Sequence, residues 1–539
     1  MRQWALFTGM AAVLLYSSCN PAPKYVKPVA PTPVSYKEAA PEQFKEGAGW
    51  KVAQPSDDKI RAKWWEMYND PQLNALEERA STANQTLAAA EANYRAARAL
   101  VVSARAALYP TISTAPAYSN SRISGTRGAQ VINPGNPGSS GFSKAYNDFS
   151  LPIDVSYTVD FWHRIRNTIA ANAYSAQASA ADVATSLLSI QSTLAQDYFQ
   201  VRALDMQRSV LEDTLRNYRD TLNLTQTLYR AGIDSEEDVT LAQTQLDTAT
   251  AQATDLGVAR AQYEHAIATL IGEPAADFSL AVAPFVPKPP TVPVALPSVL
   301  LERRPDIAAA ERQIAALNAE IGVARAAYYP NLTLSASGGL ESSSFTQWFT
   351  WPSRFWALGP TLSQTIWEGG ARRGQNEQAQ ANYDAGVANY RQTVLSAFQA
   401  VEDNLSSLRI LAQEIEQDQT AIESSAHYLQ LALVRYKSGV DSYLNVITAQ
   451  NAVLSNRETQ VQAQLREMVA SVSLVLALGG GWDRSQLPSI EHLTDKQRGW
   501  EPGGPKMPPA TNEVSAPNPP QVPPAPLQPP AANHTGANR

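Results

Sequence analysis

Cysteine and histidine are scarce in this chain of 539 residues. Its one cysteine, Cys19, excludes a disulfide within the chain. The five histidines are scattered without the spacing of metal ligands, so we expect no metal site. The sequence also lacks a phosphate-binding glycine-rich loop that ends in lysine, and it lacks a Gly-x-Ser-x-Gly nucleophile motif. These absences argue against an enzyme, and we expect neither catalytic residues nor a cofactor.

Basic residues and long apolar runs are limited as well. The formal net charge is −7 and the isoelectric point is about 5.5, so nothing favours binding to nucleic acid. Beyond the N-terminus, no apolar run reaches the roughly 20 residues that a membrane-spanning helix needs. If the chain enters a membrane, it must do so by another structure.

The N-terminus has the features of a bacterial export signal. Residues 1–18 read as a signal peptide with an apolar centre at Trp4–Tyr16. Cys19 follows in a setting similar to a lipoprotein box, which predicts lipid attachment there, although Tyr16 stands where that motif usually has leucine. The alternative is a chance cysteine near an ordinary cleavage site. Residues 19–57, rich in proline, alanine and lysine, are then predicted to form a lipidated, extended tether.

The longest regular pattern covers residues 368–478. It predicts a helix of about seventy residues, on the order of 100 Å long, a tight turn at 437–441, and a second helix that returns. Spacing by sevens predicts a left-handed supercoil against neighbouring helices. The apolar residues that show this spacing on the first helix are Val387, Val394, Val401, Leu408, Ile415, Ile422, Leu429 and Tyr436.

The chain contains this hairpin twice. Residues 163–230 predict another long helix, which ends at Tyr229-Arg230-Ala231-Gly232-Ile233-Asp234-Ser235, close to Tyr436-Lys437-Ser438-Gly439-Val440-Asp441-Ser442. The segments 104–110 and 324–330 also match each other almost residue for residue. We therefore predict a first repeat at 58–271, a linker at 272–302, a second repeat at 303–482, and a proline-rich, disordered tail at 483–539.

Each repeat also contains a pair of predicted strands. Residues 149–161 alternate strictly between apolar and polar side chains, over a length that suits a strand crossing a bilayer. The others are predicted at about 111–119, 331–340 and 355–367. A soluble β-sandwich hairpin is the alternative. Four strands cannot close a barrel, and open edges are not tolerated in lipid, so closure requires strands from other copies.

Several motifs resemble one family. The most specific is Leu300-Leu301-Glu302-Arg303-Arg304-Pro305-Asp306-Ile307, and supporting segments lie at 160–162, 366–370 and 477–482. Over about residues 58–482 the chain resembles the TolC/OprM-like outer-membrane factors, which are outer-membrane efflux lipoproteins of the resistance-nodulation-division type. This resemblance implies a homotrimer with a shared twelve-stranded β-barrel in outer-membrane lipid and a periplasmic α-barrel of long coiled-coil hairpins. It also implies a passive duct, served by a periplasmic adaptor and an inner-membrane pump.

The resemblance places a gate at the hairpin tips, residues 229–241 and 436–448. The positions that match the family's constriction are Leu444 and Thr448, and Thr448 replaces an acidic residue. Further gate candidates are Asp441 and Asn445, and the candidates for adaptor contact are Gly232, Asp234, Gly439, Val440 and Ser442. The alternatives are structural: Leu444 packs in the helix seam, the acids favour a helix N-terminus, and the glycines end helices.

Three functions remain open on this reading. The first is a passive exit channel for drugs, organic compounds or metal ions. The second is a duct of the same fold that serves protein secretion by an ATP-driven system. The third is a coiled-coil lipoprotein without a pore, which the paired strands in both repeats disfavour.

Overall fold

The structure, a computed structural model, describes residues 20–30, 32–33, 36–38, 63–122, 145–283, 288–290 and 303–494. These residues belong to one contact unit, Met1–Thr494. The predicted signal peptide, the predicted lipid site Cys19, and the tail beyond Thr494 lie outside the described residues.

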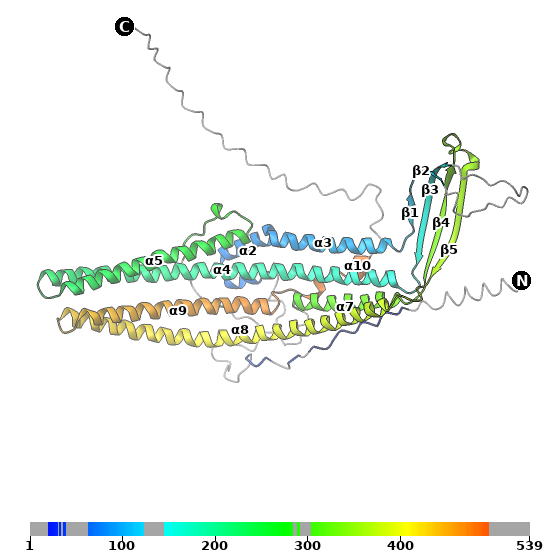
Figure 1. Ribbon diagram of the computed structural model, residues 1–539. Helices are drawn as coiled ribbons and strands as arrows, with labels where there is room; N and C mark the ends of the chain where they lie inside the picture. Colours follow the sequence, from blue (N-terminus) through cyan, green and yellow to red (C-terminus); the bar gives the residue numbers. More distant parts are fainter. Residues whose placement is uncertain are drawn as a thin grey trace, which may run out of the picture. The chain divides into compact units, whose positions relative to one another are not determined.

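Two helical hairpins of equal length form most of this unit (Figure 1). In the first, α4 (Arg164–Arg230, 67 residues) packs against α5 (Glu236–Leu270, 35 residues). In the second, α8 (Ala371–Lys437, 67 residues) packs against α9 (Tyr443–Ala477, 35 residues). The matched lengths agree with the predicted duplication. No helix among the described residues has the length and apolar character that membrane crossing requires.

A shorter helix continues the line of each returning helix (Figure 1). These are α3 (Gln85–Ala106) beyond α5 and α7 (Pro305–Ala326) beyond α9, each of 22 residues. Helix α4 packs against both α3 and α7, and α7 also packs against α8. The chain before α3 forms η1 (Trp64–Tyr68) and α2 (Pro71–Ala83), with a first break before Pro71 and a second at Asn84. Asn84 causes the second break, because its side chain caps α3 by accepting from Leu87 N–H.

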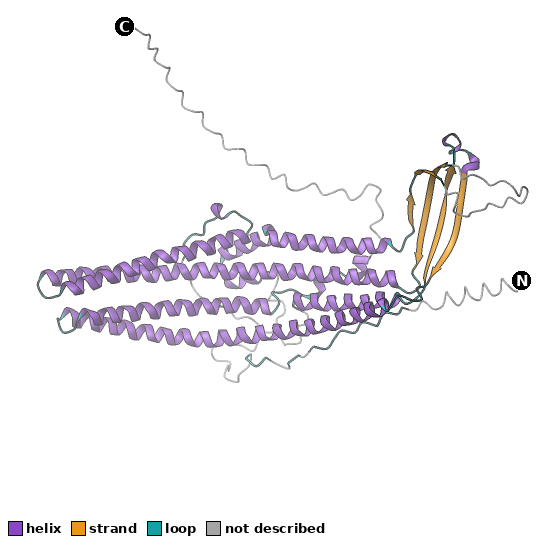
Figure 2. Cartoon of the chain, viewed as in Figure 1, coloured by secondary structure: helices purple, strands orange, loops and turns teal. Residues whose placement is uncertain are grey.

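The strands form one antiparallel sheet at one end of the helices (Figure 2). They are β1 (Thr111–Thr114), β2 (Ala117–Ser121), β3 (Tyr146–Val159), β4 (Asn331–Ser342) and β5 (Arg354–Ser363). Strands β1 and β2 both pair with β3, β3 pairs with β4, and β4 pairs with β5. The sheet therefore has four columns of strands, one of which is interrupted.

Three predicted strand bounds require correction. The strand predicted at 111–119 is divided between Thr114 and Ala117, where Pro116 cannot donate to the ladder. The strand predicted at 149–161 begins earlier, at Tyr146, and ends at Val159. The strand predicted at 355–367 ends at Ser363, because its partner β4 begins opposite it at Asn331.

Two predicted loose segments are packed onto the helices. In the predicted tether 19–57, Ala30 and Tyr36 are buried in a cluster with residues of α7, α8 and α9. In the predicted tail 483–539, η5 (Arg484–Gln486) and α10 (Ile490–Thr494) are ordered, and Leu493 is buried against Val101 of α3 and Ile169 of α4. Both segments contain apolar side chains too sparse to show periodicity, so the sequence pattern could not reveal their docking.

Candidate gate at the hairpin tips

The two hairpin tips have the same backbone structure. Gly232 has φ of +77° and Gly439 has φ of +69°, and no atom lies within 4 Å of the position of an added Cβ at either residue. The next N–H donates back into the helix in both cases, from Ile233 to Leu228 O at 2.9 Å and from Val440 to Arg435 O at 3.0 Å. Glycine is needed here for the left-handed turn and not for space.

The acids beside the tips are partly engaged in local structure. Ser235 begins α5 by accepting from Asp238 N–H, and acidic residues fill the first turn, where the helix dipole favours them. Ser442 begins α9 without a side-chain cap. Asp441 pairs with Arg435 of the same hairpin at 2.7 Å. Asp441 is thus held inside its own hairpin.

The predicted constriction residues lie on one exposed face of α9. Leu444 is 60% exposed, and the Thr448 hydroxyl donates to the Leu444 carbonyl at 2.9 Å, one helical turn away. Asn445 is half-buried beside them. The buried face of this turn is formed by Tyr443 and Val446. Within the single chain, Leu444 therefore does not pack in the seam.

A tyrosine joins the two tips. The buried Tyr436 hydroxyl, on α8, donates to the Asp234 carboxylate at the tip of the other hairpin. It also lies 3.0 Å from Thr225 Oγ1 on α4. Burial, together with the neighbouring Asp234, raises the pKa of this hydroxyl, so it remains a proton donor at neutral pH. The sequence indicated Tyr436 only as a heptad residue, and its counterpart Tyr229 is 45% exposed.

Polar side chains continue this junction away from the tips. Gln450 of α9 donates to Thr221 Oγ1 of α4 at 3.1 Å, and both residues are buried. Gln245 of α5 donates to Tyr218 at 3.0 Å and also to Asn451 of α9. Farther from the tips, α4 and α9 meet through an apolar cluster. Near the tips, the hairpins are joined both by these hydrogen bonds and by a second apolar cluster, which includes Leu222 of α4 and Tyr443 and Val446 of α9.

Buried charges elsewhere hold the helices together. Arg202 of α4 is 2% exposed and pairs with Asp205 at 2.9 Å, and Asp205 also pairs with Arg260 of α5 at 2.8 Å. Arg202 and Arg260 also donate to the carbonyls of Ala281 and Leu280, which follow α5. These ion pairs and the hydrogen bonds to the two carbonyls fix residues 280–281 onto α4 and α5.

Glu77 of α2 is a buried acid of a different kind. Neither carboxyl oxygen has a hydrogen-bond partner among the described residues, and the side chain is fully buried. Burial raises its pKa well above the ordinary value of 4.5, so the folded state keeps a proton that the unfolded chain releases. Since the unfolded state then binds fewer protons, stability is full below the ordinary pKa and falls as pH rises towards the folded pKa.

Comparisons with known proteins decide the family. The model of the family described as outer membrane efflux protein matches residues 76–273 and 296–480, which is more than half of the chain. The chain belongs to this family. The resemblance predicted from the sequence is confirmed, and family members are channels and not enzymes. The reading as a coiled-coil lipoprotein without a pore is thereby excluded.

The relatives cover nearly the whole chain. The pyoverdine export outer membrane protein OpmQ of Pseudomonas aeruginosa is 33% identical over 479 residues, which cover 88% of this chain and 96% of the relative. The toluene efflux pump outer membrane protein TtgC of Pseudomonas putida is 27% identical over 481 residues, covering 89% and 96%. This chain is an outer-membrane efflux channel protein.

Solved structures agree. The outer-membrane channel OprN superimposes with a TM-score of 0.75 at 27% identity, over 86% of this chain and 100% of that chain. The open state of the MtrE outer membrane channel of Neisseria gonorrhoeae superimposes with a TM-score of 0.71 at 25% identity, over 86% and 99%. No cluster of three or more potential metal ligands occurs in the described parts of the chain.

Proposed function

We propose that three copies of this chain form the passive exit channel of a tripartite efflux system in the outer membrane. A periplasmic adaptor and an inner-membrane pump supply the energy and open the tips. The observation that carries this proposal is the sheet. It has four columns of strands and two open edges, one formed by β1 and β2 and the other by β5. Three copies that pair edge to edge would close a barrel of about twelve strands and remove every open edge.

One face of the sheet suits contact with lipid. The register places Val155, Ala336 and Leu358 opposite one another across three strands, with Ile153, Leu334 and Leu362 on the same face. Of these, Leu358 is 73% exposed within the single chain. Exposed aromatic residues lie at both ends of the sheet, such as Phe349 and Trp351 after β4 and Trp367 after β5. Such belts are typical of the two interfaces of a membrane barrel.

The helices offer an edge for other copies as well. Helix α8 exposes Leu395, Ile410, Leu431 and Val434, and each is at least 47% exposed in the single chain. Exposed leucines and valines along a helix of this length are typical of a further helix–helix contact. Closure of the helical layer into a periplasmic tube would bury them together with the strand edges.

The gate is proposed at the tips. In a closed ring, the exposed face of α9 that carries Leu444 and Thr448 would face the axis, with Asp441 and Asn445 beside it. The bond from Tyr436 to Asp234 would then hold the two hairpins of each copy together. The exposed tip residues Gly232, Gly439, Val440 and Ser442, with Asp234, are proposed to meet the adaptor.

Lipid attachment at Cys19 is proposed as the second membrane contact. Its neighbour Asn20 is held at the start of α4, where Asn167 donates to the Asn20 side-chain oxygen at 3.0 Å. Helix α4 begins next to the end of β3, so this contact would place the lipid at the end of the helices that adjoins the sheet. Intact mass of the mature protein tests the assignment, with Cys19→Ser as the variant that loses the acyl chains.

Small molecules are the proposed cargo. The relatives named above export pyoverdine or toluene, and protein secretion remains the alternative for the same fold. In-cell cross-linking, purification and mass spectrometry decide between the two. An adaptor and a proton-driven pump support small-molecule efflux, whereas an ATP-driven secretion complex would indicate protein cargo. A monomeric mass in mild detergent, with no conductance in lipid bilayers, would refute the shared barrel.

A further inference from the structure

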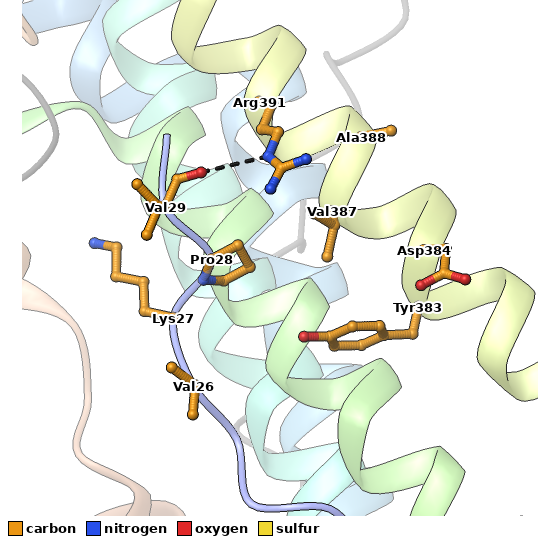
Figure 3. A pocket seen from close by; sticks show the side chains of 9 residues that line it. All are labelled: Val26, Lys27, Pro28, Val29, Tyr383, Asp384, Val387, Ala388 and Arg391. Atoms are coloured by element: carbon orange, nitrogen blue, oxygen red, sulfur yellow. Dashed lines mark hydrogen bonds between the residues drawn. The ribbon is translucent and has the colours of Figure 1, made fainter. Parts of the chain in front are cut away.

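The N-terminal segment is attached to α7 and α8 at several of its described residues. This N-terminal strap comprises residues 20–38, of which 31, 34 and 35 are not described, and its described residues form neither helix nor strand. Figure 3 shows part of the strap, Val26–Val29, lying beside α8. From Pro21 to Lys27, successive strap residues contact α7 residues of decreasing number. From Val29 to Glu38, they contact α8 residues of increasing number. The strap therefore runs antiparallel to α7 and parallel to α8.

One face of α7 binds the first part of the strap. Arg325 donates to Pro21 O at 3.5 Å, Asn318 donates to Pro23 O at 2.9 Å, and Glu311 pairs with Lys27 at 3.0 Å. These three helix residues are spaced by sevens, so they lie on one face. Glu311 is buried and also pairs with Arg484 after α9, at 3.2 Å. Its carboxylate thus joins three segments of the chain.

One face of α8 binds the rest of the strap. Arg391 donates to Val29 O at 3.3 Å. The Tyr36 ring is 4% exposed and lies 6.4 Å from the Phe398 ring, between centroids. The two oxygens of Glu402 accept from consecutive N–H groups of the strap, at 2.7 and 3.0 Å, and Arg409 pairs with Glu38 at 2.8 Å. Residues 391, 398, 402 and 409 again share one helix face.

Between the α7 contacts and the Tyr36 region, at Val26–Val29, a hollow separates the strap from α8. The hollow has a volume of about 490 Å³ and is lined by the strap at Val26–Val29 and by α8 at residues that include Tyr383, Val387 and Arg391 (Figure 3). Attachment is therefore divided between the α7 face and the region around Tyr36. The line of helices formed by α9 and α7 has a break near these contacts.

That break is the joint between α9 and α7. Helix α9 ends at Ala477 and α7 begins at Pro305, and Arg304 links them by donating to Ala477 O at 2.9 Å. Tyr36 and Ala30 of the strap are buried in one cluster with residues from both sides of this joint, namely Ile307 and Ile314 of α7 and Leu474, Ala477 and Leu478 around the end of α9.

The first repeat holds its corresponding joint differently. There, α5 ends at Leu270 and α3 begins at Gln85, and Asn84 donates to Leu270 O at 2.8 Å. Helix α2 directly precedes this joint, and its Arg79 pairs with Glu273 just beyond α5.

We propose that the N-terminal strap is a splint for the α7–α9 joint. The strap binds α7 on one side of the joint and packs against the end of α9 and against α8 on the other. Bending at the joint would require the Tyr36 cluster to separate or the Glu311 pair to break. The splint thus keeps α7 and α9 in line while the tips move.

Hydrogen–deuterium exchange of the full, trimeric protein in detergent tests this role. The variant Tyr36→Ala removes the buried ring, and Val29→Ala, on a residue that is 83% exposed, is its control. We expect amides in the first turns of α7 and the last turn of α9 to exchange faster by about tenfold or more in Tyr36→Ala. Amides at the α5–α3 joint should keep their rates, and Val29→Ala should match the natural chain at both joints.

Two outcomes would overturn the proposal. One is unchanged exchange at the α7–α9 joint in Tyr36→Ala. The other is equal acceleration at both joints, which would show a general loss of stability. If Tyr36→Ala does not assemble, Lys27→Met tests the same joint by removing the ion pair between the strap and α7. Glu311 keeps its pair with Arg484 in this variant, so the buried carboxylate still has a charged partner. The control for Lys27→Met is Lys24→Met, since Lys24 is an exposed lysine of the same strap.

Discussion

The bond between the hairpin tips gives the sharpest test of the gate. The variant Tyr436→Phe keeps the buried ring and removes only the hydroxyl that donates to Asp234 and contacts Thr225. Loss of a hydrogen bond to a charged partner costs about 1.5–3 kcal/mol. Because Asp234 is half-buried, water can replace the lost donor, so we expect the lower end of this range.

That energy sets the size of the effect. About 1.5 kcal/mol per chain shifts the balance between joined and separated tips by about tenfold. If three copies open together, the three losses add to about 4.5 kcal/mol, provided that they act independently. The variant Asp234→Asn keeps a neutral acceptor for the same hydroxyl, so its effect should be smaller than that of Tyr436→Phe.

Single-channel recording in planar bilayers, without adaptor or pump, measures this shift as longer and more frequent openings. Tyr428→Phe is the matched control, because Tyr428 lies two turns away on α8 and is 45% exposed. The reasoning fails if Tyr436→Phe and Tyr428→Phe give the same open probability. It also fails if Asp234→Asn opens the channel more than Tyr436→Phe does.

Three further predictions concern the gate and the buried charges. Leu444→Ser should raise the conductance of the channel and the entry of antibiotics, whereas Val258→Ser, on an exposed residue of α5, should not. Glu77→Gln should raise the melting temperature at pH 8 and change it little at pH 4, since only the natural acid loses a proton on unfolding at the higher pH. Arg202→Met should cost about 3–5 kcal/mol of unfolding free energy in denaturant titrations, and Arg208→Met, from an exposed pair, less than about 1 kcal/mol. Unchanged permeability of Leu444→Ser would contradict the first prediction. An equal shift of the Glu77→Gln melting temperature at both pH values would contradict the second, and an equal loss of unfolding free energy in Arg202→Met and Arg208→Met would contradict the third.

Much of the fold could be predicted from local pattern. Spacing by sevens marks the packed face of a helix wherever that helix lies, and strict alternation marks a strand with two unlike faces. The duplicated Gly232 and Gly439 turns were predicted from residue type, because only glycine adopts that backbone cheaply. The family motif at Arg304–Asp306 was recognised by resemblance, and the structure gives its physical role as the α9–α7 joint.

The site was predicted less completely. The sequence indicated the tips and named Leu444, Thr448 and Asp234, but it left Leu444 between a gate and a seam. In the tertiary structure, Tyr443 and Val446 lie in the seam of the single chain and Leu444 is exposed, which supports the gate proposal. A heptad pattern shows that one face of a helix is apolar, but near a helix end it does not fix which residues belong to that face to within one position. A shift of one residue exchanges a buried seam position for an exposed one.

The sequence alone determined the duplicated long hairpins, the strand-forming segments in each repeat and the family. Each of these depends on residues close together in the chain or on an ordered series of motifs. Only the tertiary structure showed the bond between Tyr436 and Asp234, which are 202 residues apart, and the docking of the strap at Lys27 and Tyr36. Contacts of this kind join segments without periodicity, and no local free-energy preference records which distant side chain meets which.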